Sequence, residues 1–109
     1  MRLLLGLLIS LLAGTAVAND TDLKPQLLTS VASGWQSEGF YLFFREGYKI
    51  DSCNSSTVVI KKGHGQYDEL VSMALSAFHA KSKVIVRVSS CDAGQPNSFQ
   101  VAVALRLVE

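Results

Sequence analysis

The chain has 109 residues, of which 10 are basic and 9 acidic, and its formal net charge at pH 7 is +1. This length suits one small domain rather than two. The near-neutral charge gives no electrostatic reason to expect nucleic acid or an anionic membrane as a partner.

The first residues have the pattern of a secretory signal peptide. A basic residue precedes an apolar run from Leu3 to Leu12, and an Ala-Val-Ala sequence ends at Ala18. Small side chains of this kind fit the signal-peptidase pocket. The apolar run is shorter than the about 20 residues of a transmembrane helix. We expect residues 1–18 to be a signal peptide, and residues 19–109 to form one secreted or periplasmic domain without a membrane span.

The first part of the expected mature chain is polar, and only its later part predicts strands. Residues 19–26 read NDTDLKPQ, and we expect them to be loosely ordered. A strand is predicted from Leu27 to Trp35. The aromatic-rich segment from Gly39 to Asp51 contains the turn signal Glu46-Gly47, which predicts a β-hairpin.

Apolar residues follow one another without interruption from Phe40 to Phe44. A strand with one face in water alternates instead, so one face of this strand enters the core while the other is covered by a partner or a second layer, or is exposed. Aromatic and arginine side chains stack on sugars and anchor interfaces. The candidate ligand or interface residues are therefore Trp35, Tyr41, Phe43 and Arg45. Ordinary packing inside a small barrel is the alternative interpretation.

Cys53 and Cys91 are the two cysteines of the chain, and both lie in the part expected to be exported. Cysteines in an oxidising compartment pair, so a disulfide between them is predicted. There is no Cys-x-x-Cys motif, and His64 and His79 are not at ligand spacing from either cysteine. We expect neither a metal site nor a cofactor.

A helix is predicted between the cysteines, from Tyr67 to about Ala80. Apolar residues recur along one side at helical spacing: Tyr67, Leu70, Val71, Ala74, Leu75, Ala77 and Phe78. Glycines at positions 63 and 65 mark a turn before it.

Further strands are predicted on both sides of this helix, over residues 56–62, 83–91 and 98–109, with a loop over residues 92–98. Strands with one inserted helix indicate the α+β class. The expected architecture is a small antiparallel OB-like β-barrel of about five strands with one amphipathic helix.

The segment from Tyr67 to Cys91 resembles the helix–strand–cysteine region of small exported bacterial proteins of unknown function. The order cysteine, strand, helix, strand, cysteine is also similar to the B subunits of pentameric bacterial toxins, including the pertussis and subtilase cytotoxin class. This resemblance implies an OB fold, self-association into a ring with the helix facing its central pore, and glycan binding on the outer surface. The resemblance extends to Cys53, Cys91 and the helix alone. No glycan-binding motif of these B subunits matches this sequence residue by residue.

Catalysis is not expected. Four polar residues share one face of the predicted helix, namely Asp68, Ser72, Ser76 and His79. Side chains that radiate from one helix diverge, whereas a catalytic triad converges from separate elements. The expected function is a secreted or periplasmic binding module, toxin-B-like and oligomeric, that recognises a glycan or protein surface. The alternative is a structural or accessory periplasmic protein without a small-molecule ligand.

Overall fold

The computed structural model describes residues 20–34, 38–92 and 98–109. The predicted signal peptide, Trp35 and most of the predicted loop over residues 92–98 lie outside these ranges. The described chain contains one helix and six strands, in the order β1 (Thr21–Asp22), β2 (Gln26–Ser33), β3 (Phe40–Phe44), β4 (Val58–Ile60), α2 (Tyr67–Ala80), β5 (Lys83–Asp92) and β6 (Phe99–Val108).

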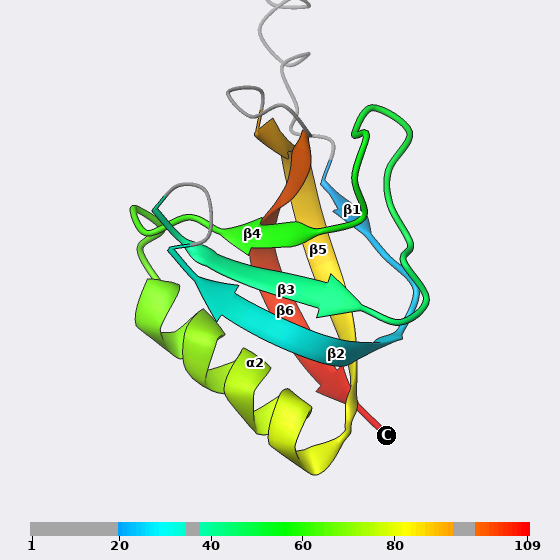
Figure 1. The fold of residues 1–109 in the computed structure, drawn as a ribbon, viewed down its shortest axis with the longest axis vertical. Coiled ribbons are helices and arrows are strands. Elements are labelled where there is room, and N and C mark those ends of the chain that lie inside the picture. The colour runs from blue at the N-terminus through cyan, green and yellow to red at the C-terminus, as the bar shows by residue number, and fades with distance from the viewer. Residues whose placement is uncertain (1–19, 35–37, 93–97) are drawn as a thin grey trace, which may run out of the picture.

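The strands form one mixed sheet in the order β1-β5-β2-β3-β4-β6, and β5 also pairs with β6 (Figure 1). That last pairing closes β2, β3, β4, β6 and β5 into a five-strand ring. The predicted α+β class is confirmed. The expectation of a purely antiparallel sheet is wrong, because β4 and β6 run parallel, with Val59 opposite Val101. The long connection through α2 and β5 lets the chain return in the same direction as β4.

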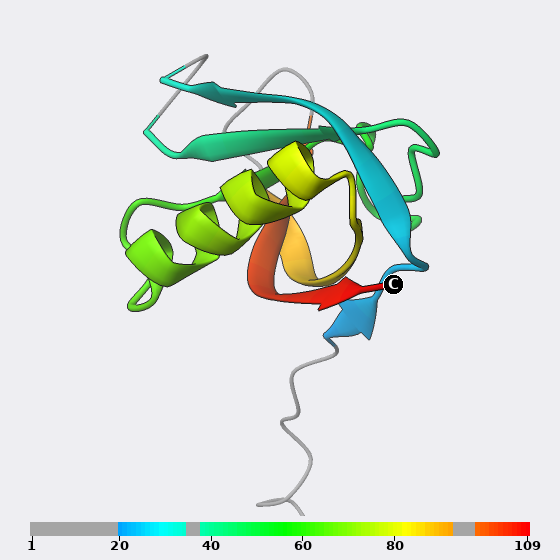
Figure 2. The same cartoon turned by 90° about the horizontal axis from the view of Figure 1, so that it is seen from below.

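Helix α2 has the predicted bounds and lies across one end of the ring (Figure 2). It packs on β2, β4 and β6 and buries Leu70, Ala74 and Ala77. Acidic residues occupy its first turn, where they suit the helix dipole. Lys81 ends the helix with φ of 57°. Most of the apolar stripe read from the sequence therefore faces the sheet, whereas Leu75, one of its members, is exposed.

The main core lies inside the ring, between the strands and α2. From β3 it receives Phe40, Leu42 and Phe44, and from β5 it receives the alternate residues Val84, Val86 and Val88. Each such side chain contributes about 1.5–3 kcal/mol when fully buried. The alternation of buried and outward-facing residues predicted for β5 is confirmed, and its inward-facing valines fill this core.

A second apolar cluster lies on the other face of β3 and explains why the aromatic run is continuous. Tyr41, Val59 and Phe99 are its buried members. The rings of Tyr41 and Phe99 meet edge to face, with centroids 5.5 Å apart and planes at 81°. Both faces of β3 are thus packed, because side chains from β4 and β6 cover Tyr41.

The predicted hairpin from Gly39 to Asp51 is wrong in its second half. Residues 45–57 form a long connection without a strand, and β3 pairs with β2 and β4 instead. Gly47 does make a turn, with φ of 72°. The backbone groups that follow it are bonded by buried side chains rather than by a neighbouring strand, as described below.

The beginning of the described chain is more ordered than predicted. Thr21 and Asp22 pair with β5, opposite Val88 and Arg87. Leu23 is buried, and its N–H donates to the carbonyl of Val86 at 2.8 Å. Residues 20–26 are polar in composition, but β1 and the start of β2 pair with successive parts of β5.

The predicted disulfide joins Cys53 to Cys91, with Cα atoms 5.5 Å apart. It connects the 45–57 connection to the end of β5. A structural disulfide is consistent with a location outside the cytoplasm. Within the ranges that the structure describes, no helix is long and apolar enough to cross a membrane.

Candidate functional site

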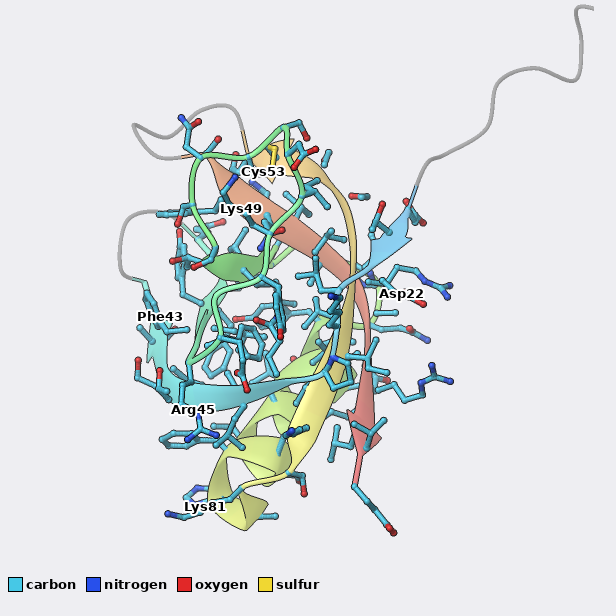
Figure 3. The ribbon with its side chains drawn as sticks, turned by 90° about the vertical axis from the view of Figure 1, so that its right-hand side faces the viewer. Asp22, Phe43, Arg45, Lys49, Cys53 and Lys81 are labelled. Carbon is cyan, nitrogen blue, oxygen red and sulfur yellow. A yellow bond between two sulfur atoms is a disulfide. The ribbon has the colours of Figure 1, made fainter. Side chains whose placement is uncertain are left out.

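The structure separates the candidate binding residues that the sequence grouped together. Tyr41 is fully buried in the second cluster, whereas Phe43 is half-buried and Arg45 is exposed. Figure 3 shows Phe43 and Arg45 on one side of the domain and Asp22 on the opposite side. Trp35 lies outside the described residues. Phe43 and Arg45 are therefore the two predicted residues that reach the surface together.

Phe43 borders a shallow hollow on the outer face of β2 and β3. The hollow has a volume of about 260 Å³ and is lined by Ser30, Val31, Ala32 and Phe43. A β-bulge interrupts the pairing of β2 with β3 between Leu28 and Ser30. Bulges re-aim side chains and are common near binding sites. The hollow thus places an aromatic ring beside an exposed serine.

Backbone contacts fix the start of the connection that carries Arg45. The N–H of Arg45 donates to the carbonyl of Leu27 at 2.9 Å, and the N–H of Leu27 donates to Glu46 Oε1 at 2.9 Å. That second bond lowers the pKa of the Glu46 carboxyl, because a backbone N–H stabilises its charged form. The backbone at Arg45 is held while its guanidinium stays in solvent.

Gln100 is one of two fully buried glutamines that hold the middle of the 45–57 connection. Its Oε1 accepts from the N–H of Ile50 at 2.8 Å, and its Nε2 donates to the carbonyls of Tyr48 and Ser56, each at 3.1 Å. Gln100 is not among the residues predicted from the sequence. A single glutamine inside the otherwise apolar strand FQVAVAL is the feature that could have indicated it.

Gln26 is the second buried glutamine, and it binds the same connection from β2. Its Oε1 accepts from the N–H of Tyr48 at 3.0 Å. Its Nε2 is buried without a hydrogen-bond partner among the residues described. Tyr48 itself is 37% exposed, and Lys24 Nζ lies 5.8 Å from the centre of its ring. The side-chain amides of Gln26 on β2 and Gln100 on β6 thus both bind the backbone of Tyr48.

The far end of the connection is tied to β5 and β6. Lys49 Nζ donates to the carbonyl of Cys53 at 2.9 Å, next to the disulfide. The N–H of Asn54 donates to Ser98 Oγ at 2.7 Å. A long connection held by a disulfide to β5 and by side chains from β2 and β6 presents a fixed surface. Long connections without regular structure are often functional.

The polar residues of α2 do not form a compact group. Asp68, Ser72, Ser76 and His79 are all exposed along the helix. In the part of the chain that the structure covers, no three histidine, cysteine or acidic side chains are placed to hold a metal ion.

Comparisons of the chain with protein-family models, with curated proteins and with solved structures find no match. Function is therefore inferred from the site itself. The site is an open hollow with one aromatic ring and one hydroxyl, next to a rigid connection that begins with a cation. These groups suit reversible binding of a ligand by stacking and hydrogen bonding.

Proposed function

We propose that this chain is a secreted or periplasmic binding module that recognises a glycan or protein surface through the outer face of β2 and β3. The observation that carries the proposal is the hollow formed by Phe43 and the segment Ser30–Ala32. An aromatic ring packs on the C–H face of a sugar, and a serine hydroxyl both donates and accepts hydrogen bonds. An open, shallow site of this kind favours a sugar over a deeply enclosed small molecule.

We infer an OB-type barrel, and the connectivity supports it. The ring strands follow one another as β2-β3-β4-β6-β5, and α2 connects the third ring strand in sequence, β4, to the fourth, β5. OB folds are five-stranded, partly open barrels that bind oligosaccharides and oligonucleotides over their second and third strands. In this chain those strands are β3 and β4, and Phe43 lies on β3.

We also propose that the module is toxin-B-like and self-associates. Two surface features favour this. Strand β2 pairs with β5 only at Gln26 and Leu27, so among the described residues Ser30–Ser33 are paired on one side only, with β3. Such an edge can pair with another strand. Leu75 on α2 is 37% exposed.

A glycan array probed with the exported protein tests the proposal. For any glycan bound, affinity is then compared among the wild type, Phe43→Leu, Arg45→Gln and the control Lys62→Gln. Lys62 is exposed in the turn before α2. Loss of the ring in Phe43→Leu should weaken binding about two- to tenfold. Loss of charge in Arg45→Gln should also weaken it, whereas Lys62→Gln should not.

A blank array, or equal affinities for the wild type, Phe43→Leu and Arg45→Gln, contradicts the glycan assignment. Circular dichroism of each variant shows whether it has folded. Binding of a protein partner that Phe43→Leu weakens would instead identify a protein surface as the target.

An accessory structural protein is the second candidate, and the position of Tyr41 favours it. Tyr41 is fully buried against Phe99 and Val59, so part of the aromatic run serves packing within the chain. This candidate predicts no glycan ligand and no effect of Phe43→Leu beyond stability.

A further inference from the structure

A second hollow lies between β1, β5 and β6. It has a volume of about 200 Å³ and is lined by Asp22, Ile85, Arg87, Ala104, Leu105 and Arg106. Asp22 lies on the side of the domain opposite Phe43 (Figure 3). The two hollows are therefore separate sites.

The pairing of β5 with β6 brings two arginines to this hollow. Arg87 is opposite Ala104, and Ile85 is opposite Arg106. The two arginines are thus diagonal neighbours on one face, a relationship in which the residues lie about 7–8 Å apart. Ala104 and Ile85 stand between them. Because alanine is small, the space between the arginines stays open above an apolar floor.

The two guanidinium groups are in different states of pairing. Arg87 donates from Nε to Asp22 Oδ1 at 2.8 Å and from Nη2 to Asp22 Oδ2 at 3.3 Å. Among the described residues, Nη1 of Arg87 has no hydrogen-bond partner. Arg106 is exposed and has no hydrogen bond or ion pair with any residue that the structure describes. Asp22 pairs directly with Arg87, whereas Asp20 and Asp22 act on the two guanidinium groups at longer range. Arg106 is therefore the guanidinium of the hollow that has no direct carboxylate partner among the described residues.

We propose that this hollow binds a small carboxylate of single negative charge that carries an apolar body. The planar guanidinium of Arg106 matches a carboxylate in a bidentate arrangement. A monoanion matches the one guanidinium without a direct carboxylate partner, whereas a phosphate monoester carries about −1.5 to −2 at pH 7. The apolar body of the ligand covers Ile85 and Ala104.

The size and the backbone of the site favour a small ligand over a peptide strand. Pockets for drug-sized ligands measure about 300–1,000 Å³, and this hollow is smaller. The backbones of Ile85–Arg87 and Ala104–Arg106 are already paired with each other. A peptide therefore finds no free strand edge on the floor of the hollow.

Titration of the exported protein, followed by ¹H–¹⁵N NMR, tests the proposal with four probes. Phenylacetate has both the charge and the apolar body. Phenylacetamide lacks the charge, acetate lacks the ring, and inorganic phosphate carries more charge. We expect phenylacetate to shift the amides of Ile85, Arg87 and residues 104–106 in a saturable way. Phenylacetamide should bind at least about tenfold more weakly, because it loses a charge-assisted hydrogen bond, and acetate and phosphate should also be weaker.

Three variants separate the contributions. Arg106→Gln removes the unpaired charge and should weaken phenylacetate binding about tenfold. Ala104→Leu fills the hollow without changing charge and should abolish the response, with unfolding midpoints used to check the fold. Asp22→Asn adds one net positive charge and should raise the affinity for phosphate relative to phenylacetate. Lys62→Gln is the control for a lost surface charge and should bind as the wild type does.

Equal binding of phenylacetate and phenylacetamide would show that the hollow does not select a carboxylate. Phosphate or an acidic peptide binding more tightly than phenylacetate would overturn the assigned ligand class. Unchanged binding in Arg106→Gln, or no saturable shift in the wild type, would overturn the site. None of these outcomes depends on Phe43, so the proposed glycan site stands or fails separately.

Discussion

Gln100 on β6 and Ile50 in the connection after β3 are joined by a hydrogen bond of 2.8 Å, from the backbone N–H of Ile50 to Gln100 Oε1. Gln100 is fully buried, and its Nε2 is used as well, on two further carbonyls of the same connection. One side chain therefore takes the place of a neighbouring strand for residues 48–56. A buried and fully satisfied amide of this kind specifies one conformation, because any alternative leaves its polar atoms without partners.

Replacement of this amide should destabilise the whole domain. Gln100→Leu keeps a side chain of similar size but leaves the N–H of Ile50 and the carbonyls of Tyr48 and Ser56 without their partner. Each buried unsatisfied group costs about 1–3 kcal/mol, so we expect a loss of about 2–5 kcal/mol in the free energy of unfolding. Urea denaturation measures it. Gln66→Leu, at an exposed glutamine before α2, is the control and should change stability by less than about 0.5 kcal/mol. Equal stability of Gln100→Leu and the wild type would contradict this account.

Gly39 should resist substitution, whereas Gly63 should not. Gly39 has φ of +146°, and a Cβ there would lie 2.9 Å from both the carbonyl oxygen of Ile60 and Val59 Cγ2. Gly39→Ala should therefore lower the free energy of unfolding by about 1–3 kcal/mol. At Gly63 a Cβ meets no atom within 4 Å, so Gly63→Ala should be neutral or stabilising by up to about 1 kcal/mol. Thermal unfolding of both variants measures the difference, and equal midpoints would refute it.

The disulfide should contribute substantially to stability. The bonded cysteines are 38 residues apart, for which the chain-entropy model gives about 4 kcal/mol. The double variant Cys53→Ala and Cys91→Ser should lose a few kcal/mol and show faster amide exchange in residues 49–54. The wild type treated with a reductant is the matched control and should behave like the variant. Two free thiols in the native exported protein would show that the bond is absent.

The helix and the disulfide could be predicted from the sequence because their signals are local or unambiguous. Helix α2 begins at Tyr67 and ends at Ala80, as its apolar spacing indicates. The chain offers one pairing for Cys53 and Cys91. The parallel pairing of β4 with β6 has no local signal, since it depends on how the chain returns after α2 and β5.

Contacts between residues distant in sequence explain two differences from the prediction. The second strand of the predicted hairpin does not form, and Tyr41 is buried away from the other candidate binding residues. The turn at Gly47 exists, but Gln26 and Gln100 bind the backbone of Tyr48 and Ile50, so no second strand forms. The uninterrupted apolar run in residues 40–44 places one face of β3 in the core and leaves the cover of the other face undetermined. It does not reveal that Phe99, from the last strand, covers Tyr41.

The ion pair between Asp22 and Arg87 should make stability depend on pH in the acid range. The hydrogen bond from Arg87 lowers the pKa of the Asp22 carboxyl below its ordinary value of 3.8. A group with a lowered folded-state pKa stabilises the fold above the unfolded pKa, and this contribution disappears as the pH falls through the folded value. The stability difference between the wild type and Asp22→Asn should thus be constant near neutrality, begin to fall below about pH 4 and vanish once the pH is below the lowered folded-state pKa.

Chemical denaturation at a series of pH values measures this difference. Asp51→Asn, at an exposed carboxylate without an ion pair among the described residues, is the matched control. High salt should reduce the effect, because both partners are exposed and screened. A difference that persists at low pH would assign the effect of Asp22→Asn to something other than the ion pair.

Self-association of the exported chain is the prediction that bears most directly on a toxin-B-like role. Burial of Tyr41 removes one reason to expect it, because Phe99 and Val59 already cover that face of β3. Two reasons remain, namely the edge of β2 at Ser30–Ser33 and the exposed Leu75 on α2. A closed ring of subunits joined through strand edges protects those edges.

Light scattering at micromolar concentration should therefore give a multiple of the mass of residues 19–109. Leu75→Glu should lower that mass if the helix faces a neighbouring subunit, and Ser76→Glu, at the next exposed position, is its control. A strictly monomeric wild type would exclude the ring and leave the hollows at Phe43 and at Arg106 as the remaining support for a binding role.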